Sequence, residues 1–424
     1  MKRKLTLLIL LLLLNYNFIF SQNTIALTSE FAKGADISWL PQMEASGYTF
    51  YNDNGAAEDC FKIIKDHGIN TIRLRCWVNP SNDSKNGHCS TSETVAMAVR
   101  AQQWGMNLMI DFHYSDTWAD PGQQTKPAAW VGANFTTLLS DLYNYTFDVM
   151  SALNAAGVTP KWVQVGNEIT NGFVYPEGST SNWSQLAQLI NKGYDAVKAV
   201  SPTTKVILHI DQGNNNSRFR NWFDNAKFYG AKYDVIGMSY YPYWLSGSPD
   251  YTLSINDLGN NLNDMVSRYG KQVMVVEVGG LASAPQNTYD LLTAVINKVK
   301  AVPNNNGLGV IYWEPEGAQN WSGYPLSAWG NDGKPTFALN AFNDLTALKA
   351  TADSQLIMHQ DKQNGMIHFN ETLSKIEIIN INGTILYSVS KSNSISLNQL
   401  QKGVYLVRTT ENNTSKVSVF KCIQ

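Results

Sequence analysis

Residues 162–210 read WVQVGNEITNGFVYPEGSTSNWSQLAQLINKGYDAVKAVSPTTKVILHI, and this stretch decides the fold. It begins with a short apolar run that leads into Asn167–Glu168, and it ends with a second apolar run, Lys205–Ile210. Between the two runs, Trp183–Val200 has a helical pattern. A strand, a helix and a strand in this order predict a parallel βαβ unit.

The same alternation extends over residues 30–347. Strands are expected at Gly34–Ser38, Thr71–Cys76, Asn107–Phe112, Trp162–Gly166, Lys205–Ile210, Val235–Tyr240, Gln272–Glu277 and Leu308–Trp313. Helical segments lie between them, among them Ala57–His67, Ser92–Gly105, Phe135–Ala156, Trp183–Val200 and Thr288–Val302. Eight strands that alternate with helices predict an α/β fold of the (β/α)8 TIM-barrel type. A doubly wound open sheet is the alternative, which we disfavour because no glycine-rich phosphate loop follows a strand.

The N-terminus has the pattern of a secretory signal peptide. Three basic residues precede the apolar run Leu5–Leu14, which continues to a small residue at Ser21. A retained membrane anchor is the alternative reading. It is disfavoured because Asn15 and Asn17 leave the run short of the roughly 20 apolar residues that span a bilayer. We expect residues 1–21 to be the signal peptide.

After the barrel, expected over residues 22–348, the pattern changes to strands without helices. Residues 349–364 resemble a linker, and residues 365–424 predict a small antiparallel β-sandwich with a hairpin turn at Asn382–Gly383. The expected strands are Met366–Phe369, Ile376–Ile381, Thr384–Val389, Ser394–Leu397, Val404–Thr409 and Lys416–Lys421.

Charge and aromatic content restrict the class of ligand. The formal net charge of −2 provides no basic field for nucleic acid or an anionic membrane surface. Aromatic residues make up 11% of the chain, and flat aromatic faces often hold sugar rings, although a large aromatic core would also explain them. The composition therefore mildly favours a carbohydrate ligand.

The four cysteines do not predict a metal site. Cys60, Cys76, Cys89 and Cys422 show no CxxC or Cys/His ligand spacing, so structural zinc is not expected. Export permits disulfides, but the spacing leaves open which pair forms, if any.

Barrel enzymes place their active sites at the carboxyl ends of the strands. The polar and aromatic residues at these ends are Asp36, Ser38, Arg73, Arg75, Trp77, His113, Asp116, Trp118, Asn167, Glu168, Tyr240, Tyr241, Glu277, Trp313 and Glu314. Glu168 and Glu277 each end a strongly apolar strand, where an unpaired charge is costly. Glycoside cleavage needs two such groups, one to protonate the leaving oxygen and one to attack or to activate water. For either glutamate alone, a salt bridge to a neighbouring loop is the structural alternative.

Seven strings in the barrel region resemble those of the family 53 glycoside hydrolases, which are endo-β-1,4-galactanases. They are GADISWL (34–40), TIRLRCWVNP (71–80), DFHYSDTWADPGQQTKPAAW (111–130), VGNEITNG (165–172), IGMSYYPYW (236–244), VMVVEVG (273–279) and IYWEPEG (311–317). The resemblance covers residues 31–347. It implies a retaining hydrolase of β-1,4-galactan in the type I arabinogalactan side chains of pectin.

The resemblance also implies the catalytic roles. Glu168 would be the general acid/base, with a raised pKa, and Glu277 the nucleophile. Asn167 would hydrogen-bond the 2-hydroxyl of the sugar at the cleavage point. An arginine of the second strand, Arg73 or Arg75, and a tyrosine, taken to be Tyr240, would keep Glu277 ionised.

Further positions would bind the polysaccharide. Trp313 would form the floor under the reacting sugar, and Trp329 would form a platform on the donor side. Other residues that would line the cleft are Asp36, Ser38, His113, Asp116 and Trp118. For His113 alone, a buried structural histidine is the simpler reading. Because strand side chains alternate in direction, Arg73 and Arg75 should both face the barrel lumen.

One loop departs from the family pattern. Bacterial members often have a calcium site after the seventh strand, but residues 278–287 (VGGLASAPQN) contain no carboxylate. Calcium prefers about six to eight oxygen ligands, carboxylates among them. We therefore predict that no metal and no cofactor is needed.

The C-terminal segment resembles the sorting domain of type IX secretion, on the strings IEIININGT (376–384) and KGVYLVR (402–408). The resemblance implies an interaction with the secretion machinery and a protein that is secreted or held at the outer cell surface. We also expect a monomer. Two other functions remain as alternatives. One is another endo-glycanase of the same clan, such as a mannanase or cellulase. The other is a non-catalytic surface protein that binds glycans.

Overall fold

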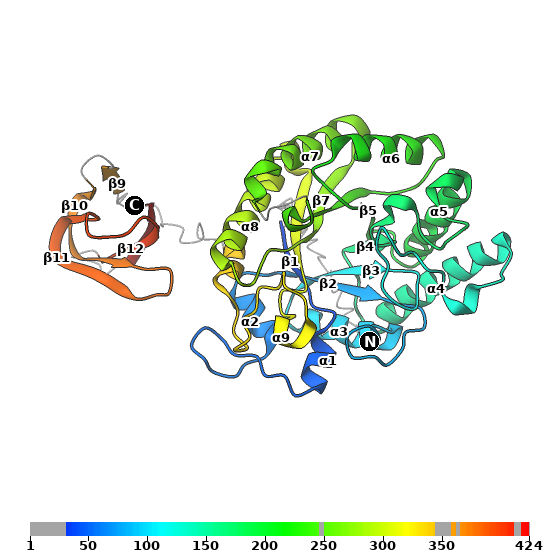
Figure 1. Ribbon diagram of the computed structural model, residues 1–424, viewed down its shortest axis with the longest axis horizontal. Coiled ribbons are helices and arrows are strands. Elements are labelled where there is room, and N and C mark those ends of the chain that lie inside the picture. Colours follow the sequence, from blue (N-terminus) through cyan, green and yellow to red (C-terminus); the bar gives the residue numbers. More distant parts are fainter. Residues whose placement is uncertain (1–30, 246–249, 344–357, 362–364, 411–416, 424) are drawn as a thin grey trace, which may run out of the picture.

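The computed structural model describes residues 31–245, 250–343, 358–361, 365–410 and 417–423. The expected signal peptide lies outside these residues. The first body is a closed barrel of eight parallel strands (Figure 1). Its strands are β1 (Ala32–Asp36), β2 (Thr71–Cys76), β3 (Asn107–Phe112), β4 (Trp162–Val165), β5 (Lys205–Ile210), β6 (Val235–Tyr240), β7 (Gln272–Val278) and β8 (Gly307–Trp313). Because β8 pairs with β1, from Ala32↔Gly309 to Asp36↔Trp313, the sheet is not open. The predicted (β/α)8 barrel is confirmed.

Helices surround the strands, as Figure 1 shows. They are α1 (Leu40–Ala45), α2 (Cys60–Asp66), α3 (Thr91–Gln103), α4 (Phe135–Ala155), α5 (Trp183–Val200), α6 (Asn216–Phe228), α7 (Ile255–Tyr269), α8 (Pro285–Lys300) and the short α9 (Gln319–Ser322). Local sequence explains where several begin. Ser90 and Glu93 form a reciprocal capping box at the start of α3, and the side chain of Asn134 accepts from Thr137 N at the start of α4. Gly270 ends α7 in the left-handed conformation that favours glycine.

The strands separate two sets of buried side chains. On β2, Ile72, Leu74 and Cys76 belong to the large apolar cluster between strands and helices. Arg73 and Arg75 alternate with them and hydrogen-bond to side chains of other strands, as the lumen face requires. A separate small cluster consists of apolar strand residues, namely Ala32, Met109, Trp162, Ile207, Val235, Met274, Val276, Leu308 and Ile311. The lumen is thus a packed interior, which supports a polar site at the carboxyl ends of the strands.

The second body is an antiparallel sheet of five strands, orange and red in Figure 1. Its strands are β9 (Met358–Asp361), β10 (Met366–Ile379), β11 (Ile385–Ser396), β12 (Val404–Thr410) and β13 (Val417–Ile423). The helix-free antiparallel fold agrees with the prediction, but in the described residues the strands pair as one continuous sheet rather than two. Register irregularities in β10, between His368 and Leu373 and between Ile378 and Ile379, accompany its pairing with β11.

The predicted linker, residues 349–364, is wrong over Met358–Asp361. These residues form β9, which pairs with the first part of β10, from Phe369↔Met358 to Met366↔Asp361. A four-residue run without a turn signal does not predict a strand by itself, and the pairing with β10 is what makes it one.

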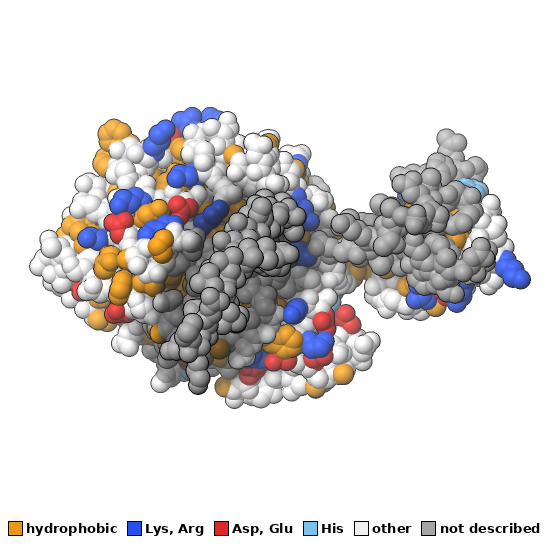
Figure 2. Space-filling view, turned by 180° about the vertical axis from the view of Figure 1, so that it is seen from behind, with side chains coloured by type: hydrophobic (Ala, Val, Ile, Leu, Met, Phe, Trp, Pro, Cys, Tyr) orange, Lys and Arg blue, Asp and Glu red, His pale blue; other side chains and the backbone are white. Residues whose placement is uncertain are grey.

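The surface has no dominant sign of charge on the face drawn in Figure 2. Over the described part of that face, basic and acidic side chains are interspersed. Within the described ranges, no helix combines the length and apolar character needed to cross a membrane.

Candidate active site

A cavity of about 470 Å³ lies at the carboxyl ends of the strands. Six of the predicted site residues line it, namely His113, Trp118, Asn167, Glu168, Glu277 and Trp313. They come from β3, β4, β7 and β8 or from the loops that follow. The barrel therefore brings both glutamates, 109 positions apart in the chain (277 − 168), to one cavity.

The backbone around Glu168 turns sharply out of β4. Gly166 has a φ of 90°, and an added Cβ there would lie 2.4 Å from a methyl group of Ile169. Glu168 itself has a φ of 44° and a ψ of 50°, which is a left-handed conformation that side chains other than glycine seldom adopt. Strain of this kind concentrates at functional sites, where the surrounding structure over-determines it. The turn ends β4 and presents the Glu168 side chain to the cavity.

The two carboxyl groups have different electrostatic surroundings. Burial raises the pKa of Glu168 well above 4.5, and the charge of Glu277 raises it further. Burial also raises the pKa of Glu277, to about 7, but Arg73 and a hydrogen bond from Tyr241 act in the opposite direction. Burial and the neighbouring negative charge thus favour the protonated form of Glu168, whereas Arg73 and Tyr241 favour the ionised form of Glu277. One group is suited to donate a proton and the other to attack.

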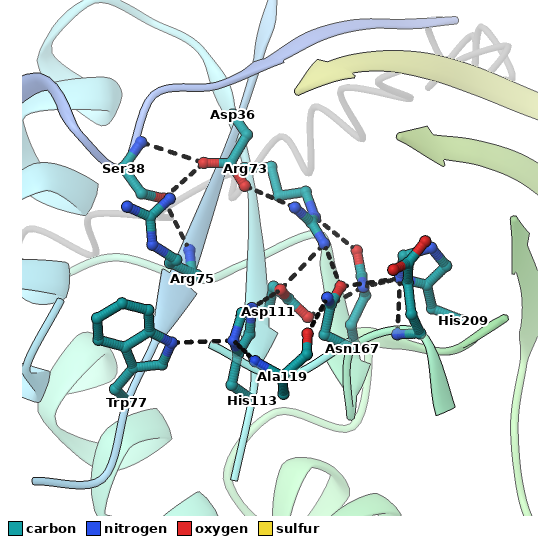
Figure 3. Close-up of polar contacts among 12 residues, drawn as sticks. Asp36, Ser38, Arg73, Arg75, Trp77, Asp111, His113, Ala119, Asn167 and His209 are labelled. Atoms are coloured by element: carbon teal, nitrogen blue, oxygen red, sulfur yellow. Dashed lines mark hydrogen bonds and ion pairs between the residues drawn. The ribbon is translucent and has the colours of Figure 1, made fainter. Parts of the chain in front are cut away.

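Arg73 holds the side of the site around Glu277 together. Its Nη2 donates to Oε1 of Glu277 at 2.8 Å and to Oδ1 of Asn167 at 2.9 Å. Its guanidinium also pairs with Asp36 at 2.6 Å and Asp111 at 3.0 Å, as Figure 3 shows. Of the two candidate arginines, Arg73 is the one that contacts Glu277.

Arg75 contacts other side chains than Arg73 does. It pairs with Glu314, and its guanidinium carbon lies 4.4 Å from the ring centroid of Trp118. A cation over an aromatic face is attracted by the ring's negative face. Arg75 thus holds the Trp118 ring in the cavity wall.

The expectation that Tyr240 contacts Glu277 is wrong. The hydroxyl of Tyr241 donates to Oε2 of Glu277 at 3.2 Å, whereas that of Tyr240 bonds to Ser254 Oγ at 2.8 Å. The pairing of β6 with β7 explains the difference. Ser239 is in register with Glu277, and Tyr240 is in register with Val278. Tyr240 therefore packs in the large cluster with Val278, while Ser239 and Tyr241 line the cavity.

Trp313 lines the cavity and packs near Trp39 and Trp118, with ring centroids 5.6 and 5.9 Å away. Trp329 does not form the predicted aromatic platform on the donor side of the cleft. Its side chain is 1% exposed, its indole nitrogen donates to the Gly333 carbonyl, and its ring packs edge-on against Phe50. It follows β8 in a loop that folds back into the core, so its face is covered by protein.

Three other predicted residues lie outside the cavity lining. Asp36 is fully buried and binds Arg73, while Ser38 Oγ donates to Asp36 at 2.5 Å and accepts from Arg75 N. The carboxylate of Asp116 accepts from the backbone nitrogens of Asn79 and Ala128. These side chains support the walls of the cleft rather than line it.

For His113 the sequence left two interpretations open, a residue that lines the cleft and a buried structural histidine, and both apply. It lines the cavity, yet it is 3% exposed and fully bonded. Its Nε2 lies 2.9 Å from Asp111, and its Nδ1 accepts from Trp77 at 2.9 Å and from Ala119 N at 3.2 Å (Figure 3). It is a structural histidine that also forms part of the wall.

Sequence reasoning missed several residues of the site. Tyr241 lines the cavity and was among the expected strand-end residues, but no role was expected for it. The residues not expected at all are Ser239, Tyr324, Asp120, Asp211, Gln212, Asn214 and Trp244, which line the cavity, and Asp111, Gln164 and His209, which lie buried next to it. The last three had a visible signal, because each is the one polar side chain in the interior of an otherwise apolar strand. The loop residues had none.

The structure gives no indication of a metal centre among the described residues, where no three His, Cys, Asp or Glu side chains form a metal-binding group. The four cysteines are buried and free, so no disulfide joins them.

Comparison with known proteins assigns the barrel. The model of glycosyl hydrolase family 53 matches residues 32–351. The chain belongs to this family. Among family 53 relatives, an arabinogalactan endo-β-1,4-galactanase of Thermothelomyces thermophilus is 33% identical over 311 residues, which are 68% of this chain and 90% of that protein.

Solved structures agree. A family 53 catalytic domain from Ignisphaera aggregans superposes with a TM-score of 0.68 at 28% identity, covering 74% of this chain and 96% of that one. A fungal β-1,4-galactanase structure has a TM-score of 0.66 at 31% identity, covering 73% and 98%. Residues 361–423 match the secretion system C-terminal sorting domain, which indicates that the protein is exported.

Proposed function

We propose that this family 53 hydrolase is a retaining endo-β-1,4-galactanase that acts on galactan in the type I arabinogalactan side chains of pectin. The observation that carries the proposal is the pair of carboxyl groups in one cavity. Glu277 is paired with Arg73, and burial raises the pKa of Glu168 well above 4.5. The galactanases among the relatives and the solved structures support the substrate.

In the first step, protonated Glu168 gives its proton to the glycosidic oxygen as the bond to the anomeric carbon breaks. Glu277 attacks that carbon and forms a covalent galactosyl-enzyme. In the second step, Glu168, now ionised, takes a proton from water, and the water displaces Glu277. Two inversions leave the β-configuration unchanged.

The surrounding residues serve these steps. Arg73 and Tyr241 donate to the two oxygens of Glu277, which favours the ionised form that attacks. Asn167 is held by Arg73 at Oδ1 and by the Ala119 carbonyl at Nδ2, at 2.9 and 2.8 Å, and is thereby positioned for the 2-hydroxyl of the sugar. Trp313 offers an aromatic face to the reacting sugar.

The test is hydrolysis of linear galactan beside mannan and carboxymethylcellulose, with NMR of the first reducing sugar released. The proposal predicts cleavage of galactan and initial β-anomer. A first product of α-configuration would refute retention. Preferred cleavage of mannan or cellulose would favour another endo-glycanase of the clan.

A second measurement separates catalysis from binding alone. Glu277→Ala should remove hydrolysis while galactan still binds, as measured by calorimetry. If the unchanged chain binds galactan without cleaving it, the protein is a surface glycan-binding protein. If Glu277→Ala keeps full activity, the assigned mechanism is wrong.

We also propose that the C-terminal sheet directs the chain to type IX secretion, so that the enzyme acts as a monomer outside the cell or on its surface. The sorting-domain match over residues 361–423 supports this route. Deleting residues 361–424 should keep the enzyme inside the producing cell, and light scattering should give the mass of one chain.

A further inference from the structure

A chain of buried polar side chains links Arg73 to Glu168 beneath the cavity. Arg73 Nε donates to Gln164 Oε1 at 2.8 Å, and Gln164 Nε2 lies 3.0 Å from His209 Nδ1. His209 Nε2 lies 2.7 Å from Ser239 Oγ, and Ser239 Oγ donates to Glu168 Oε1 at 2.6 Å. His209 is fully buried and Ser239 is 2% exposed. The described steps of catalysis leave both without a role.

The direction of every hydrogen bond in this chain follows from its first member. An arginine nitrogen only donates, so Gln164 must present its oxygen to Arg73 and its amide nitrogen to His209. The same amide nitrogen donates to Asp111 Oδ1 at 3.0 Å, which agrees with this orientation. His209 Nδ1 is thus an acceptor.

A second donor confirms the tautomer of His209. The backbone nitrogen of Glu168 lies 3.3 Å from the same Nδ1. Oδ1 of Asn167 is also 3.1 Å from Nδ1, but a proton on Nδ1 that bonded to it would face the two donors, Gln164 Nε2 and Glu168 N. With two donors facing Nδ1, the proton of neutral His209 lies on Nε2. Burial lowers the pKa of His209 well below 6.5, which keeps the ring neutral.

The remaining two bonds are then determined. His209 Nε2–H donates to Ser239 Oγ, so the Ser239 hydroxyl proton is directed to Glu168 Oε1. Because Oε1 of Glu168 accepts this hydrogen bond, the carboxyl proton is favoured on the other oxygen, Oε2.

We propose that His209 and Ser239 are positioning residues that hold Oε1 of Glu168 as an acceptor and so place the transferable proton on Oε2. The inference rests on the proposed role of Glu168 as the acid. Its consequence is that loss of Ser239 weakens protonation of the leaving group, not attack by Glu277.

Leaving-group dependence tests this directly. Ser239→Ala should lower kcat/KM for galactan and for aryl β-galactobiosides with poorly acidic phenols by about tenfold, a part of the 10²–10⁴-fold that a general acid supplies. For the dinitrophenyl galactobioside, kcat/KM should change little, because the dinitrophenolate leaving group departs without needing a proton. A merely structural role of Ser239 would lower both rates by the same factor, and that result would overturn the proposal.

Matched variants complete the experiment. Ser254→Ala removes a buried hydroxyl that bonds to Tyr240 at 2.8 Å, away from Glu168, and should leave the leaving-group dependence unchanged. His209→Gln keeps a donor towards Ser239 and should resemble the unchanged protein, whereas His209→Leu should resemble Ser239→Ala. If His209→Leu does not fold, the leaving-group dependence of Ser239→Ala and His209→Gln still tests the positioning role.

The failure of this inference can be told from failure of the proposed function. Glu168→Ala should show the steepest leaving-group dependence of all the variants. If it shows none, Glu168 is not the acid. If Glu168→Ala shows a steeper leaving-group dependence and Ser239→Ala does not, only the positioning role of His209 and Ser239 is refuted.

Discussion

Tyr241 donates its hydroxyl to Oε2 of Glu277 at 3.2 Å, while its neighbour Tyr240 points to the opposite side of β6. Hydrogen bonds to charged groups contribute about 1.5–3 kcal/mol. Tyr241→Phe should therefore lower kcat/KM for galactan by roughly 10- to 100-fold. Tyr240→Phe should lower stability by about 1 kcal/mol and leave kcat/KM unchanged. Equal kinetic effects of the two variants would contradict the register of β6.

Activity should depend on pH through both glutamates. In the proposed mechanism Glu277 must be ionised and Glu168 protonated, and burial raises the pKa of Glu277 to about 7 and that of Glu168 well above 4.5. As pH rises, kcat/KM should first increase as Glu277 loses its proton and then decrease as Glu168 loses its own. In Glu168→Gln, measured with a dinitrophenyl galactobioside, the alkaline decrease should disappear. An alkaline limb that persists would assign it to another group.

Two buried carboxyl groups below the cavity should make stability depend on pH. Burial raises the pKa of Glu314 to about 7, and burial and the charge of Glu314 raise that of Glu316 well above 4.5. The folded state therefore binds protons more tightly than the unfolded state. The stability gained is complete below about pH 4.5 and is lost as pH rises through 7 and beyond.

Glu316→Gln should therefore flatten this loss, as denaturant unfolding from pH 5 to 9 would show. Glu314→Gln should instead destabilise the fold by roughly 3–5 kcal/mol, because it leaves Arg75 buried without its partner. A Glu316→Gln variant as pH-dependent as the unchanged protein would contradict the assignment.

Trp313 and Trp329 should respond differently to truncation. Trp329→Ala creates a cavity in the core and should cost about 3–5 kcal/mol of stability, with little change in galactan affinity. Trp313→Ala should weaken binding several-fold, up to roughly tenfold, because a stacking face is lost. Calorimetry in a Glu277→Ala background measures the affinity, and thermal unfolding measures the stability. If Trp329→Ala weakened galactan binding and Trp313→Ala only lowered stability, Trp329 would be the residue that binds the sugar.

Metal removal should have no effect. Residues 278–287 supply no carboxylate, so a chelator should leave the melting temperature of the enzyme unchanged. The control is the same titration with added calcium. A large decrease that calcium reverses would reveal a site built from other residues.

The sequence predicted several strands to the residue, whereas β4 and β7 each end one residue away from the expected position. Strands β2, β3, β5 and β6 have the predicted bounds, and so does α5. Periodicity also directed Arg73 and Arg75 to the same face. Both glutamates could be found because a carboxyl group after a buried strand is costly and therefore informative.

Sequence reasoning failed where the answer depends on pairing or on loop paths. Tyr240 and Tyr241 are adjacent and chemically alike, and only the register of β6 against β7 decides which one faces Glu277. Trp329 lies in a loop whose return into the core has no periodic signal. The chain of buried polar side chains from Arg73 to Glu168 needs four strands in register, β2, β4, β5 and β6, which no single stretch of sequence contains.

Closure of the barrel has a consequence for when the enzyme becomes active. The last strand, β8, completes the ring by pairing with the first, β1, and carries Trp313 at its end. A chain that is still emerging from the ribosome without β8 has two unpaired strand edges and lacks Trp313. The ring that brings Glu168 and Glu277 to one cavity is therefore complete only after the last strand of the barrel has been made.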